Sequence, residues 1–255
     1  DLRMSRGLGD VYKRQALEEG YDANSTLTEI DVKAAKKSTS EKISKMSGKK
    51  MSLRYAVEDS KNGCAYSLYN IITPKVGLSY IENMNFSKIV QQDYTLSSGL
   101  GGLHHGTNTV EMANAYSTLE NHGEYRQADC ISSILDASGN EIYEEPESKT
   151  VYTRSASDQM TDILEGVLNS SAGTAKGLKW SSASDVAAAA KTGTTNDNNV
   201  AWFCGYTPYY TISVWVGYDY PKSVKGLWGN TYPAYIWKEA MPVSYTHLTL
   251  PTILL

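Results

Sequence analysis

Four consecutive residues, Lys191, Thr192, Gly193 and Thr194, combine groups that can hold an anionic ligand. A lysine ammonium and two hydroxyls can bind a carboxylate through charge-assisted hydrogen bonds. The glycine lacks a Cβ, so a ligand backbone can approach the chain closely there. Thr192 and Thr194 would hold the carboxylate, the Thr194 backbone N–H would supply half of an oxyanion hole, and Lys191 would make the site positive. We expect these residues to form a strand at a sheet edge that faces a groove.

The residues after this motif narrow its interpretation. Standing alone, the four residues could equally be a lysine and threonines on an ordinary exposed strand. A phosphate-binding loop is excluded, because its first glycine and its lysine after a second glycine are not in place. Val200 to Tyr206 and Thr211 to Tyr218 are rich in aromatic and β-branched residues, and residues 207–210 separate them. This pattern predicts a β-hairpin next to the motif strand.

The composition is that of a globular protein with one sizeable core, conceivably two domains. The 255 residues are 41% hydrophobic and 20% charged, which is far from the composition of a disordered chain. The 19 tyrosines against 2 phenylalanines suggest half-buried aromatic positions with a polar edge, as in extended substrate grooves. The net charge of -4 gives no reason to expect nucleic acid or an acidic membrane surface as a partner.

The cysteines and the apolar runs exclude further classes of protein, namely disulfide-rich, zinc-binding and membrane-spanning ones. Cys64, Cys130 and Cys204 have neither metal-ligand spacing nor the pattern of a disulfide framework. We therefore expect neither a disulfide framework nor a zinc site. No apolar run approaches the ~20 residues that cross a bilayer, so a membrane anchor is expected to lie outside this sequence.

Apolar periodicity and capping residues predict several helices. The clearest spans Ser155 to Leu168, where apolar residues recur at i, i+3 and i+4. Ser52 is predicted to cap a helix that reaches Asn62, and Thr109 to cap another whose apolar face runs to Leu119. The other expected elements are a helix end at 17–20, a loop over 22–50 with at most a short strand, a helix near 66–76 broken at Pro74, and two short strands within 131–143 around a turn at 136–140. Helices flanking a mainly antiparallel sheet make the fold class α+β.

From Ala16 to about Met241 the chain resembles the transpeptidase domain of high-molecular-weight penicillin-binding proteins. The bifunctional class A type, which also carries an upstream glycosyltransferase domain, is the most similar. Lys191 to Thr194 matches the third motif of this family, and the similarity extends through residues 201–208. The other similar segments are 98–106, 111–116 and 171–175. The resemblance implies the fold that these proteins share with serine β-lactamases, a mainly antiparallel sheet flanked by helices.

The resemblance also assigns the second family motif, Ser-x-Asn, to Ser60, Lys61 and Asn62. In the family this serine moves a proton between the catalytic lysine, the leaving amine and the lysine of the third motif, here Lys191. The asparagine hydrogen-bonds an amide of the substrate side chain. Without the resemblance, Ser60 and Asn62 would be polar residues at a helix end. Ser170, Ser171 and Asn108 would satisfy an equally loose search.

The first family motif, Ser-x-x-Lys, carries the serine nucleophile and the lysine that activates it. The resemblance places it roughly three helical turns before Ala16. Residues 1–15 occupy that place. The residue three positions after Ser5 is Leu8, where the motif requires a lysine. Ser47 and Lys50 have the spacing of this motif, but their polar, Gly/Lys-rich surroundings predict a loop. The motif needs a buried helix N-terminus. The nucleophile is therefore expected to be missing from this chain.

Both ends of the chain resemble translated sequencing-adapter sequence. The segments concerned are residues 1–15 and about 243–255, and neither has a sustained helical or alternating pattern. Tails of this kind do not contribute to the fold of the domain. We therefore expect residues 16–242 to be the C-terminal portion of a penicillin-binding transpeptidase domain between two non-native tails.

The resemblance implies a D,D-transpeptidase that cross-links peptidoglycan stem peptides through a serine acyl-enzyme. Its partners would be the D-Ala-D-Ala end of a stem peptide and β-lactams, at the extracytoplasmic face of a bacterial membrane. The chain as printed is expected to be inactive, since the nucleophile is missing. Two alternatives remain: a serine β-lactamase-like hydrolase, and a non-catalytic binding domain that keeps the groove.

Overall fold

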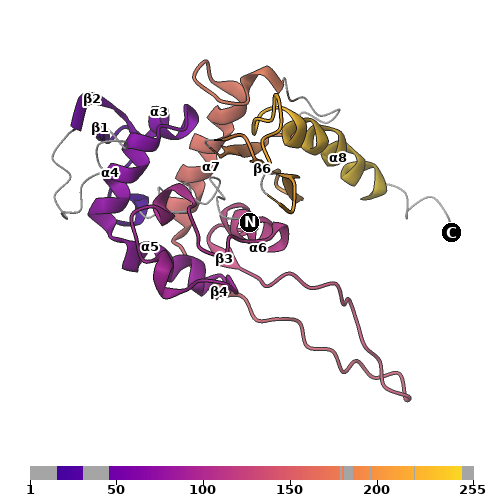
Figure 1. The fold of residues 1–255 in the computed structure, drawn as a ribbon. Helices are drawn as coiled ribbons and strands as arrows, with labels where there is room; N and C mark the ends of the chain where they lie inside the picture. Colours follow the sequence, from indigo (N-terminus) through magenta and orange to yellow (C-terminus); the bar gives the residue numbers. More distant parts are fainter. Residues whose placement is uncertain are drawn as a thin grey trace.

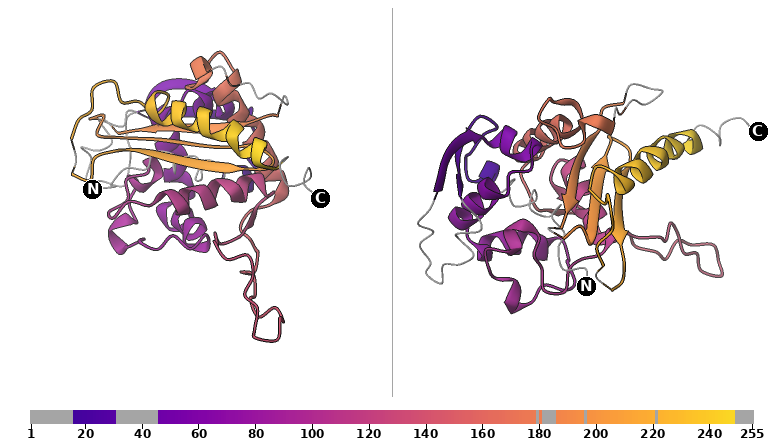
Figure 2. Two further views of the ribbon diagram at one scale, coloured as in Figure 1. Left: turned by 90° about the vertical axis from the view of Figure 1, so that its right-hand side faces the viewer. Right: turned by 45° about the horizontal axis from the view of Figure 1, so that its top comes forward.

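The computed structural model describes residues 16–30, 46–178, 180, 186–195, 197–220 and 222–248. A three-stranded sheet forms one side of the molecule. Helix α8 (Tyr232–Leu248) covers one face of this sheet, and α6 (Thr109–Glu120) and α7 (Arg154–Asn169) pack on the other (Figure 2). A second group of helices lies beyond α7 (Figure 1). The expected α+β class is confirmed.

The sheet consists of β5 (Ala189–Thr194), β6 (Val200–Tyr206) and β7 (Thr211–Gly217), in that order and antiparallel. The expected hairpin is therefore β6–β7, and β5 lies at the edge of the described sheet. Lys191 is opposite Cys204. The Thr195 N–H donates to the Val200 carbonyl at 3.0 Å. Because backbone groups alternate along an antiparallel ladder, the N–H of Thr194 points away from β6, toward the open edge.

Helix α7 has the clearest origin in the sequence. The Thr153 side chain caps it by accepting a hydrogen bond from the Ala156 N–H. Met160, Ile163, Leu164 and Val167 form the buried stripe that the spacing predicts. The helix thus presents one apolar face to the sheet and to the helices beyond it.

The second group of helices comprises α3 (Leu53–Glu58), α4 (Asn62–Ile72) and α5 (Pro74–Asn83). Ser52 caps α3 as expected, accepting from the Tyr55 N–H. The predicted helix from 52 to 62 is wrong in its extent, since α3 ends at Glu58 and Ser60 adopts a left-handed φ of 54°. The predicted break at Pro74 is confirmed: α4 ends at Ile72, and Pro74 occupies the first turn of α5, where its missing N–H costs nothing.

Three other local expectations differ from the structure. Asn108, not Thr109, caps α6, its side chain accepting from the Glu111 N–H. The segment 22–50 contains β1 (Thr26–Ile30), which pairs with β2 (Met46–Ser52) in a two-stranded sheet. Helix α8 continues to Leu248, so the first residues of the expected C-terminal tail are helical. Residues 1–15 lie outside the described residues.

Residues 131–143 do not form the two expected strands. They belong to an extended arm that runs out from the body of the molecule (Figure 1), and one isolated bridge, between Leu135 and Glu141, links its two sides. The turn at its tip is as expected, with Asp136 accepting from the N–H groups of Ser138 and Asn140. Strand pairing is restricted to the base, between β3 (Glu124–Tyr125) and β4 (Lys149–Thr150). The arm lacks a packing surface that would support longer strands.

The Trp237 side chain fixes α8 against the sheet. Its Nε1–H donates to the Gly205 carbonyl at 3.1 Å, and its ring packs on Phe203 with centroids 5.2 Å apart. A Cβ at Gly205 would come within 2.7 Å of the indole, so glycine is required for this close approach. None of the helices in the described parts of the chain is long and apolar enough to span a membrane.

We predict that Gly205→Ala destabilises the protein by about 1–3 kcal/mol, because the added methyl group overpacks the α8–sheet interface. Urea denaturation followed by circular dichroism measures the change. Gly177→Ala is the matched control, since a Cβ there meets nothing within 4 Å. Equal stability of the two variants would contradict this account of the interface.

Candidate active site

The residues singled out in the sequence meet at one pocket of about 240 Å³. Ser60 lines it from the turn between α3 and α4, Asn62 from the first position of α4, and Thr192 to Thr194 from β5. Lys191 lies beneath them, with 1% of its surface exposed. Ser60 and Lys191, which are 131 residues apart in the chain, therefore come together, as the resemblance leads one to expect. The remaining lining residues are Thr174, Trp228, Gly229 and Asn230.

The Lys191 ammonium is held at the base of this pocket. It donates to Ser60 Oγ at 2.9 Å and to the Thr192 carbonyl at 2.9 Å. A buried cation must be compensated by such hydrogen bonds, because burial in a low-dielectric interior costs several kcal/mol otherwise. The arrangement places a positive charge directly under the hydroxyls of the pocket.

Ser60 reaches Lys191 because the chain turns sharply between the two helices. The Ser60 N–H donates to the Val57 carbonyl, and the Lys61 N–H donates to the Ala56 carbonyl at 2.8 Å. The left-handed backbone of Ser60 is unfavourable for a residue with a Cβ. Lys61 turns away from the pocket to Asp59, 2.6 Å distant, whose hydrogen bond raises the pKa of the Lys61 ammonium. The middle residue of the triplet is thus outside the site.

A loop before β5 supplies Thr174, for which the sequence predicted no role. Its hydroxyl lies 2.8 Å from the Thr192 hydroxyl. The loop is attached to the buried Glu58, whose carboxylate accepts from Ser170 Oγ at 2.7 Å and whose carbonyl accepts from the Thr174 N–H at 3.1 Å. The similarity of residues 171–175 to a family segment had pointed to this loop, but it did not indicate which residues the loop contacts.

A second loop, residues 226–231, joins the sheet region to α8 and covers one face of β5. The Gly229 N–H donates to Thr194 Oγ1 at 2.8 Å, and Asn230 Nδ2 donates to the Thr174 carbonyl at 3.0 Å. Gly229 lies so close to Gly193 that a Cβ on Gly229 would come within 2.8 Å of the Gly193 nitrogen. Sequence reasoning missed this loop, since its only signal is a glycine- and asparagine-containing stretch before a helix.

The other sequence matches to the first and second family motifs lie outside this pocket. Gly48 to Lys50 form part of strand β2, not the expected loop, and are exposed. Asn108 serves as the α6 cap, and Ser170 is bonded to Glu58. Histidines are common catalytic bases, but the described histidine side chains, those of His104, His105 and His122, are absent from the lining of the pocket.

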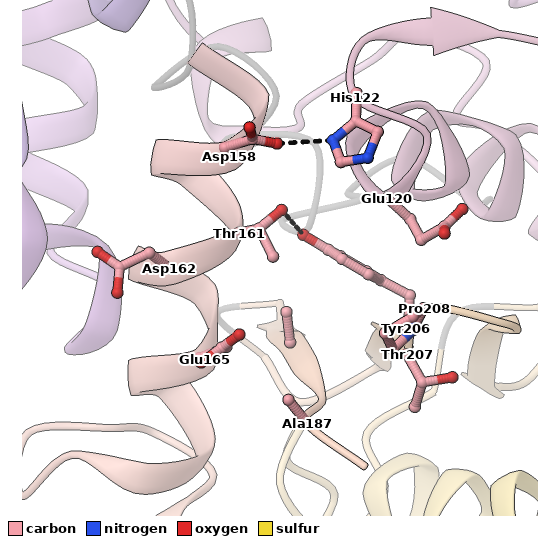
Figure 3. A pocket seen from close by; sticks show the side chains of 11 residues that line it. Glu120, His122, Asp158, Thr161, Asp162, Glu165, Ala187, Tyr206, Thr207 and Pro208 are labelled. Carbon is pink, nitrogen blue, oxygen red and sulfur yellow. Dashed lines mark hydrogen bonds and ion pairs between the residues drawn. The ribbon is translucent and has the colours of Figure 1, made fainter. Parts of the chain in front are cut away.

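A separate hollow of about 280 Å³ lies between α6, α7 and the ends of β5 and β6 (Figure 3). Glu120 and Glu165 extend into it, and burial raises the pKa of both carboxyls. His122 is bonded to Asp158 at 2.7 Å, whereas Asp162 points away, toward Arg54 (Figure 3). Within the described residues, these groups do not form a cluster of His, Cys, Asp and Glu that could hold a metal ion.

Comparison with known proteins identifies the class. The sequence model of the penicillin-binding protein transpeptidase domain matches residues 14–241. The chain is 32% identical to penicillin-binding protein 4 of Bacillus subtilis over 76% of its own length and 31% of the relative's. It is also 32% identical to penicillin-binding protein 1A of Clostridium botulinum, over 79% and 24% of the two lengths.

Solved structures agree with this assignment in fold. PonA1 of Mycobacterium tuberculosis, solved in complex with penicillin V, matches with a TM-score of 0.75 at 21% identity, over 95% of this chain and 69% of that one. Penicillin-binding protein 1A of Haemophilus influenzae matches with a TM-score of 0.73 at 20% identity, over 97% and 42% of the two chains.

The chain therefore belongs to the penicillin-binding protein transpeptidase family, and the expected resemblance to the class A transpeptidase domain is confirmed. It spans less than a third of the length of the curated relatives named above.

We predict that Glu165→Gln raises the free energy of unfolding at neutral pH by less than about 1 kcal/mol, because this partly solvated carboxylate is only weakly destabilised. Its folded pKa is raised, so the folded state binds the proton more tightly and stability falls as pH rises through that pKa. The advantage of the variant should therefore vanish in acid, where the glutamate is neutral. Thermal melts from pH 4 to pH 8 measure it.

Glu239→Gln, at an exposed position of α8, is the control for the loss of one negative charge. If both variants shift the melting temperature alike at every pH, the effect comes from net charge and the explanation by burial fails.

Proposed function

We propose that the pocket binds the carboxylate end of a D-Ala-D-Ala stem peptide and belongs to a serine-type D,D-transpeptidase of peptidoglycan synthesis. The observation that carries the proposal is the Lys191–Ser60 hydrogen bond beneath the Thr192 and Thr194 hydroxyls. Hydroxyl donors above a buried cation form a site for an anion that also carries a backbone. Family membership supports the same conclusion.

Each group has a defined part in this proposal. The Thr192 and Thr194 hydroxyls donate to the terminal carboxylate, and the Lys191 charge attracts it. The Thr194 N–H, at the open edge of β5, donates to the oxygen of the scissile carbonyl as negative charge develops there.

Proton transfer involves the other side of the pocket. In a protein that carries the family's Ser-x-x-Lys serine, that serine forms the acyl bond to the scissile carbonyl. Ser60 Oγ, already bonded to Lys191, passes the proton that the serine loses to the leaving amine of D-alanine. The Asn62 side chain hydrogen-bonds an amide of the bound peptide. No metal or cofactor takes part in these steps.

The same groups support binding of β-lactams. A β-lactam carries a carboxylate beside a strained amide, so the Thr192 and Thr194 hydroxyls could hold it as they hold the peptide terminus. PonA1 of Mycobacterium tuberculosis, which shares the fold, was solved in complex with penicillin V. Stem peptides are the proposed substrate, so the proposed location is the extracytoplasmic face of the membrane.

We propose further that the chain as printed binds these ligands without acylation. The printed sequence contains one Ser-x-x-Lys match, Ser47 to Lys50, and this segment lies on β2. Ser60 is the one serine among the described lining residues of the pocket, and the residue three positions later is Gly63. A serine without a neighbouring lysine base one helical turn on lacks the activation that the family chemistry needs.

We predict that incubation with penicillin leaves the intact mass of the chain unchanged, and mass spectrometry measures this directly. A penicillin-binding protein known to acylate is the positive control. An adduct mapped to Ser47 or Ser60 would contradict the prediction and assign the nucleophile. Turnover of nitrocefin would instead favour the β-lactamase-like alternative.

We predict that Lys191→Met weakens binding of N-acetyl-D-Ala-D-Ala by roughly 10- to 100-fold, because a charge-assisted interaction with the carboxylate is lost. Isothermal titration calorimetry measures the affinity. Lys88→Met, at an exposed lysine, controls for the loss of a positive charge. Unchanged affinity in a folded Lys191→Met variant would refute a carboxylate site above this lysine, and absence of binding to the unmodified chain would refute the proposed function itself.

A further inference from the structure

The two hydroxyls of the proposed carboxylate site are each bonded from behind by another group. Thr194 Oγ1 lies 2.8 Å from the Gly229 nitrogen. A backbone N–H can only donate, so Thr194 Oγ1 is the acceptor in this contact. The proton of the Thr194 hydroxyl therefore stays available for a second acceptor, such as a ligand in the pocket.

The Thr192 hydroxyl has a different neighbour. It lies 2.8 Å from Thr174 Oγ1, and either hydroxyl can be the donor. If the Thr192 hydroxyl donates its proton to Thr174, a ligand in the pocket faces an oxygen lone pair of Thr192. If Thr174 donates to Thr192, the Thr192 proton is free to bond the ligand. A carboxylate only accepts, so it selects the second arrangement.

Thr174 is fixed on both sides of its own peptide. Its N–H donates to the Glu58 carbonyl at 3.1 Å, and its carbonyl accepts from Asn230 Nδ2 at 3.0 Å. Glu58 is two residues before Ser60, and Asn230 follows Gly229. The loop with Thr174 is thus attached both to the turn that carries Ser60 and to the loop that bonds Thr194.

We propose that Thr174 is a positioning residue that makes the site selective for a terminal carboxylate. By donating to Thr192 Oγ1 it directs the Thr192 proton into the pocket, where the Thr194 proton is already directed by the Gly229 N–H. Two donors then face one carboxylate. The inference rests on the proposed function, since it assumes that a carboxylate occupies this pocket.

The arrangement disfavours a neutral amide at the same place. An amide group has one acceptor oxygen and an NH2 that can only donate. An amide NH2 therefore fits only if the bond reverses and Thr192 donates to Thr174, which leaves Thr194 as the one hydroxyl donor to the amide oxygen. The carboxylate receives two hydroxyl donors and the amide receives one, and this difference supplies specificity.

The test compares N-acetyl-D-Ala-D-Ala with its C-terminal amide by calorimetric titration of the full chain. We expect the unmodified chain to bind the carboxylate form more tightly. Thr174→Val removes the hydroxyl at nearly constant shape and should reduce this preference roughly tenfold, mostly through weaker binding of the carboxylate. Thr174→Ser keeps the hydroxyl and should retain the preference.

Thr211→Val, on β7 away from the pocket, is the matched control, and thermal melts establish that each variant is folded. Asn230→Ala removes the bond to the Thr174 carbonyl and should lower the preference by a smaller factor, which tests the same arrangement by another route. An unchanged preference in folded Thr174→Val overturns the inference alone. An equal loss for both ligands also overturns it, because it indicates a merely structural role. Failure of the unmodified chain to bind the carboxylate form overturns the proposed function, and the inference with it.

Discussion

The hydrogen bond between Lys191 Nζ and Ser60 Oγ is the contact on which the site depends. Lys191 belongs to the sheet and Ser60 to the helical group, so this bond joins the two parts of the molecule at the pocket. Lys191 is 1% exposed, and burial of a cation is tolerated only where its donors find acceptors. The left-handed turn at Ser60 is one consequence of this requirement. Its backbone cost is offset by the bond that the turn makes possible.

Two loops fix the hydroxyls of Thr192 and Thr194 by hydrogen bonds, as Ser60 fixes the ammonium of Lys191. Glu58 holds the loop that carries Thr174, and Asn230 connects that loop to the one that bonds Thr194. The glycines in these loops permit distances that a side chain would prevent, as Gly229 against Gly193 demonstrates. A site formed by several loops can be rigid when each loop is bonded to the others as well as to its own strand or helix.

The parts of the fold that the sequence predicted are those with a local cause. The stripe of α7, the Ser52 cap and the β6–β7 hairpin each follow from residues a few positions apart. The break between α3 and α4 was missed because its cause is distant: Ser60 turns to meet Lys191. Thr174 and Asn230 were missed for the same reason, since neither has a local pattern that indicates which residue it contacts. The arm was misjudged because β-branched residues favour strands only where a packing surface is available.

The hollow of Figure 3 and the pocket above Lys191 show why chemistry, not volume, identifies the site. The hollow of Figure 3 is somewhat larger, but it is lined by carboxyl groups, and burial raises the pKa of two of them, those of Glu120 and Glu165. The smaller pocket is lined by the Thr192 and Thr194 hydroxyls, beside the Thr194 N–H and the buried ammonium of Lys191. An edge strand normally carries a risk of unwanted pairing. Beside this pocket the open edge of β5 leaves the Thr194 N–H pointing away from β6, where it can serve the proposed ligand site.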